Sequence, residues 1–438
     1  MIFSLIKKGV RVGFFGLGKS NLSLASRLPL DNCEIILRSD VPVDRSKLPK
    51  VLQNAVIFEG NEAESNICEN VIFFSPSVKR DRPSLISAQK RGVIFSSDAE
   101  LFFERSRSPL FAITGSDGKS TTATITQMLL KEAGYNAALC GNVGVPFVDA
   151  DIQADYTVAE LSSFMLHYYA PKSYSACVTN ITPNHLDWHT DFEEYRQAKL
   201  SLLKEAERVI IPNSLMEINA PYAVIGDDYS MLKRQFSAQL FITAEGGYIR
   251  KNGEKLIDLS CVLRSEKHNV NNLMMAIAMT HELVGEDEIA SVATRFDGLE
   301  HRCKRIFSKD NVDFIDSSID STPARTAQTL RSLGKRVVLI LGGRGKGLDY
   351  SLMIPEIEKY AEAVVITGEN EEDIYSDLSP YKKCVVISNF DEAVKVGIEL
   401  STGAEALLLS PASTSFDKFK NYAERGERFK KIVTNYYK

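Results

Sequence analysis

Short apolar runs rich in β-branched residues alternate with longer amphipathic stretches along the chain. The clearest runs are residues 10–15, 71–74, 110–114, 176–180, 337–341, 363–367 and 406–409. Buried parallel strands consist of continuous apolar runs, and their alternation with helices is typical of layered α/β proteins. The pattern therefore predicts an α/β fold in which helices cover parallel sheets.

Two interruptions of this pattern divide the chain. A polar segment at 104–109 precedes a new strand, and a second change near 301–305 follows a helix predicted at 269–283. We predict three α/β domains, at residues 1–107, 108–302 and 303–438. Within the central domain, residues 222–263 contain shorter β-like segments and glycine turns, which predict a small side sheet.

Composition and charge narrow the class of protein. Apolar residues make up 44% of the chain and charged residues 25%, as in ordinary globular proteins. The net charge is −5 and the 52 Lys and Arg residues are dispersed, which argues against a nucleic-acid partner, because such binding needs clustered cations. The chain has neither a secretory signal pattern nor an apolar run of about 18 residues, so we expect a cytoplasmic protein without a membrane partner.

The seven cysteines stand singly in the sequence. They are Cys33, Cys68, Cys140, Cys177, Cys261, Cys303 and Cys384. Because no pair has CxxC spacing, neither a zinc site nor a disulfide framework is predicted. Isolated thiols of this kind fit a reducing cytosol.

A phosphate-binding loop is predicted at 114–122, where TGSDGKSTT joins an apolar strand to a helix predicted at 123–133. A glycine turn before a helix N-terminus directs backbone N–H groups and the helix dipole at phosphates. We expect Lys119 to reach the terminal phosphates and the Ser120 hydroxyl to bind Mg²⁺. The nucleotide-binding residues expected in the loop are Gly115, Ser116, Asp117, Gly118, Lys119, Ser120 and Thr121.

The loop TGSDGKST resembles the TG-x-x-GK-[ST] loop of the Mur ligases and their folylpolyglutamate synthetase relatives. The resemblance implies an enzyme that uses ATP to join an amine to a carboxylate through an acyl phosphate. It also implies a Rossmann-like N-terminal domain, a P-loop-type central ATPase domain and a Rossmann-like C-terminal domain. This chain has Asp117 where the family usually has asparagine.

Three further residues complete the catalytic set that the resemblance implies. Glu160 follows an apolar strand, and an acidic residue at the carboxyl end of such a strand faces the ligand crevice of an α/β sheet. NITPNHLD at 180–187 is similar to the family's N-[IV]-x-x-[DN]-H-x-D signature and implies that His185 binds a second metal ion, with Asp187 orienting its ring. Lys199 matches the family lysine that CO₂ converts to a carbamate.

The resemblance therefore assigns catalysis to Lys119, Glu160, His185 and Lys199. It assigns two Mg²⁺ ions to Ser120, Glu160, His185 and Lys199. Neither His167 nor His189 has motif support, and we expect both to be structural.

Later motifs imply that the third domain helps to close the nucleotide site. EKHNVNNL at 266–273 resembles the family's HN helix start and implies that Asn269 contacts adenine. Arg302 matches an HR element expected to contact phosphate. Asp316 follows a predicted strand and resembles the family's aspartate near the ribose.

The C-terminal motifs favour the D-glutamate-adding members of the family. LILGGRGK at 339–346 resembles the LGG-x-x-K loop, in which Lys346 is expected to pair with an amino-acid carboxylate. LSPASTSFDKFKNYAERG at 409–426 resembles a family run that implies Ser415 and Tyr422 in the D-glutamate pocket. The chain departs from the family at Ser318 and Asp320, where lysine and threonine are usual, and this leaves the acceptor amino acid open.

The first domain is expected to hold a UDP-sugar. Ser20 lies in a partial glycine motif at 16–21, Ser75 lies in a turn similar to the family's SPG, and Asn142 matches the family's GN-[IV]-G element. The partial motif lacks a third glycine, and no acidic residue is placed for a ribose, so NAD binding is not predicted.

The expected protein is a monomeric, ATP-dependent ligase acting on small molecules, which adds D-glutamate to UDP-N-acetylmuramoyl-L-alanine in peptidoglycan precursor synthesis. Two alternatives remain. One is a related Mur-type or folylpolyglutamate-synthetase-like ligase with another acceptor. The other is a non-catalytic nucleotide-binding protein, which has no need of all four predicted catalytic residues.

Overall fold

The computed structural model describes residues 2–186, 188–219, 221–345 and 348–438. The chain divides into two compact units, Met1–Phe296 and Asp297–Lys438. The described strands form one five-stranded sheet and one nine-stranded sheet in the first unit, and a six-stranded sheet in the second. The α/β fold predicted from the apolar runs is confirmed, whereas the domain boundaries at 107 and 302 stay predictions.

The five-stranded sheet is parallel and has the order β3-β2-β1-β4-β5. Its strands are β1 (Arg11–Phe15), β2 (Glu34–Ser39), β3 (Val56–Glu59), β4 (Val71–Phe74) and β5 (Ile94–Ser96). The accompanying helices are α1 (Lys19–Arg27), α2 (Pro83–Lys90) and α3 (Asp98–Arg105). The apolar runs of β1 and β4 lie in the middle of the sheet, where both faces are covered and their side chains are buried.

The nine-stranded sheet has the order β14-β13-β12-β11-β10-β9-β6-β8-β7, and β10–β12 pair in parallel. Its strands are β6 (Leu110–Thr114), β7 (Ala137–Gly141), β8 (Tyr156–Glu160), β9 (Ser173–Val178), β10 (Ala206–Pro212), β11 (Ala223–Gly226), β12 (Leu240–Glu245), β13 (Tyr248–Lys251) and β14 (Glu254–Asp258). Segment 222–263 thus continues the central sheet and ends it in an antiparallel hairpin. The prediction of a small side sheet at 222–263 was wrong, because β11 pairs with β10 and so joins these strands to the central sheet.

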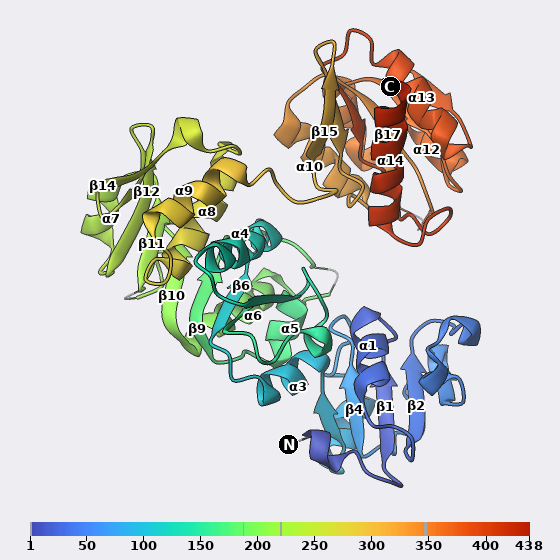
Figure 1. Ribbon diagram of the computed structural model, residues 1–438. Helices are drawn as coiled ribbons and strands as arrows, with labels where there is room; N and C mark the ends of the chain where they lie inside the picture. The colour runs from blue at the N-terminus through green and yellow to red at the C-terminus, as the bar shows by residue number, and fades with distance from the viewer. Residues whose placement is uncertain (1, 187, 220, 346–347) are drawn as a thin grey trace. The chain divides into compact units, whose positions relative to one another are not determined.

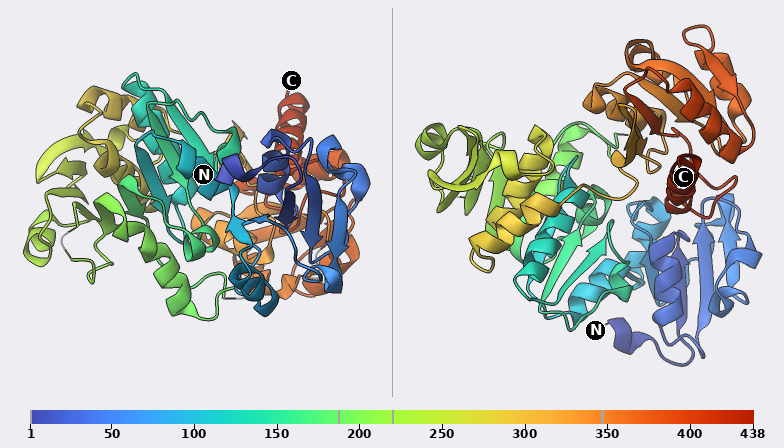
Figure 2. Two further views of the ribbon diagram at one scale, coloured as in Figure 1. Left: turned by 90° about the horizontal axis from the view of Figure 1, so that it is seen from below. Right: turned by 45° about the horizontal axis from the view of Figure 1, so that its top comes forward.

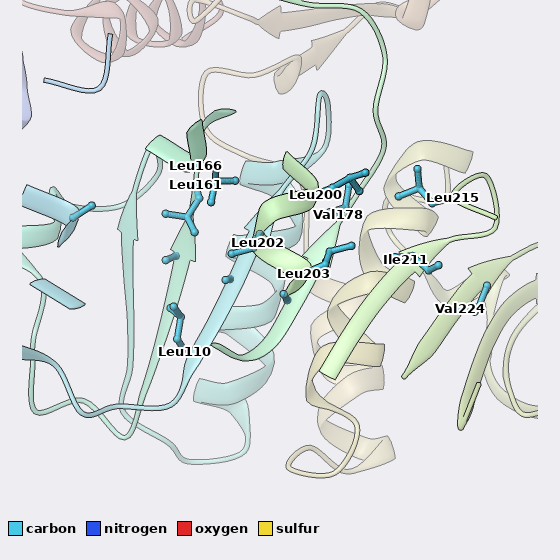
Figure 3. Close-up of a cluster of buried hydrophobic side chains, with 14 of the residues drawn as sticks. Leu110, Leu161, Leu166, Val178, Leu200, Leu202, Leu203, Ile211, Leu215 and Val224 are labelled. Carbon is cyan, nitrogen blue, oxygen red and sulfur yellow. The ribbon is translucent and has the colours of Figure 1, made fainter. Parts of the chain in front are cut away.

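Helices enclose this sheet. They are α4 (Lys119–Glu132), α5 (Ser163–Tyr168), α6 (Phe192–Lys204), α7 (Tyr229–Gln235), α8 (Lys267–Thr280) and α9 (Glu286–Arg295). Helix α4 packs beside α8 and α9 (Figures 1 and 2). Figure 3 shows the other face, where leucines of α6 share one apolar cluster with Leu110 of β6, Val178 of β9 and Leu161, which follows β8. This packing holds the carboxyl ends of β8, β6 and β9 side by side.

The six-stranded sheet of the second unit has the order β15-β16-β20-β17-β18-β19, antiparallel only between β15 and β16 among the described pairs. Its strands are β15 (Lys304–Lys309), β16 (Val312–Asp316), β17 (Val337–Leu341), β18 (Ala361–Ile366), β19 (Cys384–Val386) and β20 (Ala406–Leu409). Its helices are α10 (Pro323–Leu333), α11 (Ile354–Tyr360), α12 (Glu371–Leu378), α13 (Phe390–Leu400) and α14 (Tyr422–Tyr436). Two apolar clusters cover the two faces of the sheet.

Among the described helices, none combines the length and the apolar content that crossing a membrane requires.

Candidate active site

Two glycines shape the loop between β6 and α4. Gly115 and Gly118 have φ angles of 148° and 79°, which residues with a Cβ rarely adopt. A Cβ on Gly115 would overlap Thr179 Oγ1, and a Cβ on Gly118 would overlap Asn272 Oδ1. Gly118 is also the N-cap of α4 and places no side chain over the helix end. The first turn of α4 therefore presents its N–H groups and the positive end of its dipole, which is an anion-binding geometry.

The segment after β9 is hydrogen-bonded to the backbone of this loop. Ser116 N donates to Asn180 O and Asp117 N donates to Asn180 Oδ1, both at 2.9 Å. Thr179 Oγ1 donates to Asp117 O at 2.5 Å. Because β9 pairs in parallel with β6, both segments leave the sheet at the same edge. Thr179 had no predicted role, since a lone threonine after a strand carries no motif.

Ser116 and Thr121 are both buried. Ser116 Oγ donates to Thr182 O at 2.9 Å and lies 2.8 Å from the Tyr195 hydroxyl, so its side chain supports the loop from within. Thr121 lies in the first turn of α4, and the Asp117 side chain is exposed. Their predicted nucleotide contacts stay predictions.

The side-chain oxygens of Ser120 and Glu160 meet beside the helix N-terminus. Ser120 Oγ donates to Glu160 Oε2 at 2.7 Å, and Glu160 is buried at the end of β8, the strand next to β6. Hydroxyl and carboxylate oxygens are the ligands that Mg²⁺ prefers. Asn142 N donates to Glu160 O at 3.2 Å, so the residue predicted to lie near the UDP-sugar adjoins this pair.

Lys119 and Lys199 approach the phosphate loop from different helices. Lys119 Nζ donates to Ser116 O and Lys199 Nζ donates to Gly115 O, each at 2.7 Å. Lys199 is 2% exposed, and burial together with repulsion from Lys119 lowers its pKa from 10.5 to about 7. Near neutral pH the Lys199 amine is therefore present in both neutral and charged forms.

His185 lies on the exposed segment between β9 and α6 and has a positive φ of 56°. Its ring meets the edge of Phe164 at a centroid distance of 4.9 Å, and Tyr195 lies 6.4 Å away. A positive φ at a non-glycine residue is uncommon and is often found at functional positions. Asp187, which the motif implies as its partner, lies outside the described residues.

Three more residues of the first unit were predicted to bind nucleotide or UDP-sugar. Asn269 is buried in the first turn of α8, and its Nδ2 donates to Glu266 Oε2 at 3.1 Å. Ser75 Oγ donates to Gly16 O at 2.8 Å, joining the turn after β1 to the end of β4. Ser20 is half-buried in the first turn of α1. Their roles stay predictions.

In the second unit, Asp316 ends β16 and is engaged on both carboxylate oxygens. His301 Nδ1 lies 2.7 Å from Asp316 Oδ2, and Ser318 N donates to Asp316 Oδ1 at 2.9 Å. The hydrogen bond to Asp316 raises the pKa of His301. Arg302, predicted to contact phosphate, is half-buried beside this pair.

The two departures from the family pattern are buried and hydrogen-bonded. Asp320 Oδ2 accepts hydrogen bonds from Thr329 Oγ1 at 2.7 Å and from Ser410 Oγ at 2.8 Å. Ser318 Oγ accepts a hydrogen bond from Arg425 Nε at 3.0 Å, and Ser318 O accepts one from Nη2 at 2.9 Å. Arg425 was not among the predicted site residues, although it lies in the RG pair that ends the motif at 409–426. A guanidinium thus lies beside Ser318, where the family usually has a lysine.

Ser415 lies in the segment before α14, and Tyr422 is the first residue of that helix. Ser415 is buried, and its carbonyl accepts a hydrogen bond from Phe419 N at 2.9 Å. Tyr422 is exposed at the first helical position, and its carbonyl accepts one from Ser318 Oγ at 2.8 Å. The third predicted pocket residue, Lys346, lies outside the described residues.

Two family models from one class of protein match this chain. The family model for the Mur ligase middle domain matches residues 113–280, and that for the Mur ligase glutamate ligase domain matches residues 301–413. The chain belongs to the Mur ligase family, a class of ATP-dependent ligases that form amide bonds.

Particular relatives within the family are similar over almost the whole chain. A UDP-N-acetylmuramoylalanine–D-glutamate ligase from Acetivibrio thermocellus is 33% identical, over 98% of this chain and 97% of its own length. The enzyme of the same name from Clostridium novyi is also 33% identical, over 97% and 96%. The solved UDP-N-acetylmuramate–alanine ligase of Thermotoga maritima has a TM-score of 0.59 at 17% identity, covering 98% of this chain and 99% of its own, and shares the fold.

Proposed function

We propose that the protein uses ATP to add D-glutamate to UDP-N-acetylmuramoyl-L-alanine, a step in the synthesis of peptidoglycan precursors. The full-length similarity to D-glutamate ligases supports the choice of substrates. The observation that carries the chemistry is the clustering of Lys119, Ser120, Glu160 and Lys199 around the start of α4.

This cluster suits phosphoryl transfer, which depends on positioning and on neutralising charge. The α4 N-terminus and Lys119 bind the phosphates of ATP. The carboxylate of the UDP-sugar substrate attacks the γ-phosphorus, ADP leaves, and an acyl phosphate forms. The amine of the amino acid then attacks the acyl carbon, and inorganic phosphate leaves as the amide forms.

The ligand atoms of the cluster fit Mg²⁺. Glu160 is buried and its carboxylate meets the Ser120 hydroxyl, which supplies two hard oxygen ligands at the place where the phosphates are expected. When bound, Mg²⁺ neutralises phosphate charge. His185, on the neighbouring segment, is proposed as a ligand of a second ion.

Lys199 is proposed to react with CO₂. Its neutral amine adds to the carbon of CO₂ and releases one proton, giving a carbamate. The lowered pKa of about 7 supplies the neutral amine that this reaction needs. The product is an anion near Glu160, suited to positioning a cation.

The second unit is proposed to bind the amino acid. Arg425 brings a positive charge beside Ser318, while Asp320 is directed at Thr329 and Ser410. Ser318 and Asp320, which replace the usual lysine and threonine, are both buried and therefore do not expose a negative charge to the amino acid. A carboxylate-bearing acceptor such as D-glutamate is compatible with this charge arrangement.

The free cysteines and the nucleotide substrates agree with a cytoplasmic location, and we propose that the enzyme acts there as a monomer.

The test is phosphate release in the presence of ATP, Mg²⁺ and UDP-N-acetylmuramoyl-L-alanine, with D-glutamate compared against L-glutamate, D-aspartate and other amino acids. We expect release that depends on both the UDP-sugar and D-glutamate. Release with another amino acid would keep the ligase reaction and change the acceptor. Absence of release with any UDP-sugar would contradict the proposal and favour a folate-type ligase or a binding role.

Replacing the metal-binding carboxylate gives a second test. We expect Glu160→Gln to raise the Mg²⁺ concentration needed for half-maximal activity by at least about tenfold, because even partners outside the metal shell contribute about 10–100-fold. The amide keeps the shape of the side chain and removes its charge. Mg²⁺ titrations of the phosphate-release rate measure the effect. Glu207→Gln, at an exposed position of β10, is the matched control, and an equal shift in both variants would contradict the assignment.

A further inference from the structure

Two histidines and a glutamate that the reaction does not use meet where α5 ends and α6 begins. His167 Nδ1 lies 3.3 Å from Glu194 Oε1, and His189 Nδ1 lies 4.0 Å from Glu194 Oε2. One ligand atom from each residue lies within 4.8 Å of the other two. Neither histidine has motif support, and both were expected to be structural.

His189 presents a nitrogen that hydrogen bonding leaves unsatisfied. The residue is 2% exposed, and its Nε2 lies 3.0 Å from Ser163 Oγ. Its Nδ1 is buried and has no hydrogen-bond partner among the described residues. When Nε2 donates to Ser163, Nδ1 carries a lone pair that no described donor meets, 4.0 Å from Glu194 Oε2. Buried polar atoms without partners are uncommon and costly, so this one requires an explanation.

The surroundings resemble the outer shell of a metal site. The Glu194 carboxylate accepts hydrogen bonds from Thr190 N and Thr190 Oγ1, and Ser163 orients His189. Metal-binding histidines and carboxylates are characteristically held by such partners. His167 lies in the last turn of α5, where the helix dipole favours a cation. Burial lowers the pKa of His189 to about 4, which keeps its ring neutral and able to bind metal at neutral pH.

We propose that His167, His189 and Glu194 bind one divalent transition-metal ion of the zinc type, through two imidazole nitrogens and one carboxylate. A set of two nitrogens and one oxygen suits zinc, whereas Mg²⁺ prefers oxygen ligands. Tetrahedral zinc needs ligand atoms roughly 3.4 Å apart, so separations of up to 4.8 Å must shorten by up to about 1.4 Å. The His167 and Glu194 side chains are 22% and 25% exposed, which leaves them room to move and leaves a fourth position for water.

The three proposed ligands are different residues from the proposed Mg²⁺ ligands, although the two sets are neighbours. The Phe164 ring contacts both His185 and His189, at centroid distances of 4.9 and 5.9 Å, and the two histidines belong to different ligand sets. A bound ion would join the end of α5 to the start of α6 and so tie down the segment that carries His185.

The only tryptophan of the chain is a built-in reporter for this site. The Trp188 ring lies 4.7 Å from that of His189 and 5.4 Å from that of His167. We expect Ni²⁺, added to the full chain without ATP, to quench Trp188 fluorescence with saturation at one equivalent. We also expect Zn²⁺ to reverse the quenching by competition, while millimolar Mg²⁺ does not.

Variants show whether the ion occupies these three ligands. His167→Gln and Glu194→Gln, which change partly exposed side chains, should each weaken Ni²⁺ binding by at least about tenfold. His281→Gln, in a half-buried histidine bonded to Tyr222, is the matched control and should bind as the unmodified protein does. Loss of quenching in His185→Gln with retention in His167→Gln would move the ion to the reaction site and overturn the proposal. Quenching that persists in both ligand variants, or that does not saturate at one equivalent, would overturn it as well.

Discussion

Lys119→Ala is expected to lower the rate of phosphate release about a thousandfold, with the fold left intact. The Lys119 ammonium now donates to Ser116 O within the phosphate loop and is the cation at the first helical position of α4. Removing one group that stabilises charge in the transition state typically costs 10² to 10³, roughly, in rate. Steady-state kinetics with saturating ATP and UDP-sugar measure the loss in kcat.

Lys131→Ala is the control for this variant, because Lys131 lies in the last turn of the same helix and is exposed. It removes the same charge and the same length of side chain from α4. Its rate should stay within about twofold of the unmodified enzyme, as expected for a surface charge. A similar loss in both variants would show that the helix, and not the cation beside the loop, had been damaged.

Lys199→Met is expected to lower activity strongly and to remove the pH dependence that this residue gives to stability. Loss of the carbamate should reduce phosphate release by about 10² to 10³. In the unmodified protein without CO₂, the unfolded lysine holds its proton up to 10.5 and the folded lysine only to about 7. Between these values the unfolded state binds more protons, so the stability of the native enzyme rises with pH.

The methionine variant lacks this titration. Its stability relative to the unmodified protein should therefore be most favourable below pH 7 and become less favourable toward pH 10.5. Denaturant unfolding at pH 6 and pH 9, in CO₂-free buffer without metal or nucleotide, measures the difference. Lys204→Met, at the exposed end of α6, is the control, and the same pH trend in both variants would contradict a buried, neutral Lys199.

Much of the fold followed from the sequence because buried parallel strands are continuous apolar runs. Leu110–Thr114 and Val337–Leu341 have the bounds predicted for them. The strand predicted at 176–180 is observed at Ser173–Val178, since its polar start pairs with β10 while Asn180 turns to hold Asp117. Helix α4 begins at Lys119 and not at 123, because Gly118 in the left-handed region starts the helix directly after the loop.

Motif spacing predicts which residues lie at the edge of a sheet, but it does not predict the contacts between residues that are far apart in the sequence. The resemblance implied that Ser120 and Glu160 hold the same Mg²⁺, whereas the contact between them follows from the adjacency of β6 and β8, which a motif in either segment does not encode. The same holds for Asn272, which meets Thr122 from a helix 150 positions later. Arg425 beside Ser318 shows that a charge absent from one motif is supplied by another, and this depends on tertiary packing.

The hydrogen bonds that join Thr179 and Asn180 to the backbone of residues 116 and 117 bear on the thermodynamics of nucleotide binding. A loop that is flexible before its ligand arrives loses conformational entropy when the complex forms, and affinity falls accordingly. Here the hydrogen bonds to Asp117 restrict the backbone in advance, so folding and not binding bears that entropic cost. The association of ATP is then governed mainly by the exchange of water around its phosphates for the N–H groups of α4. An inhibitor that copies the phosphates would benefit from the same rigidity.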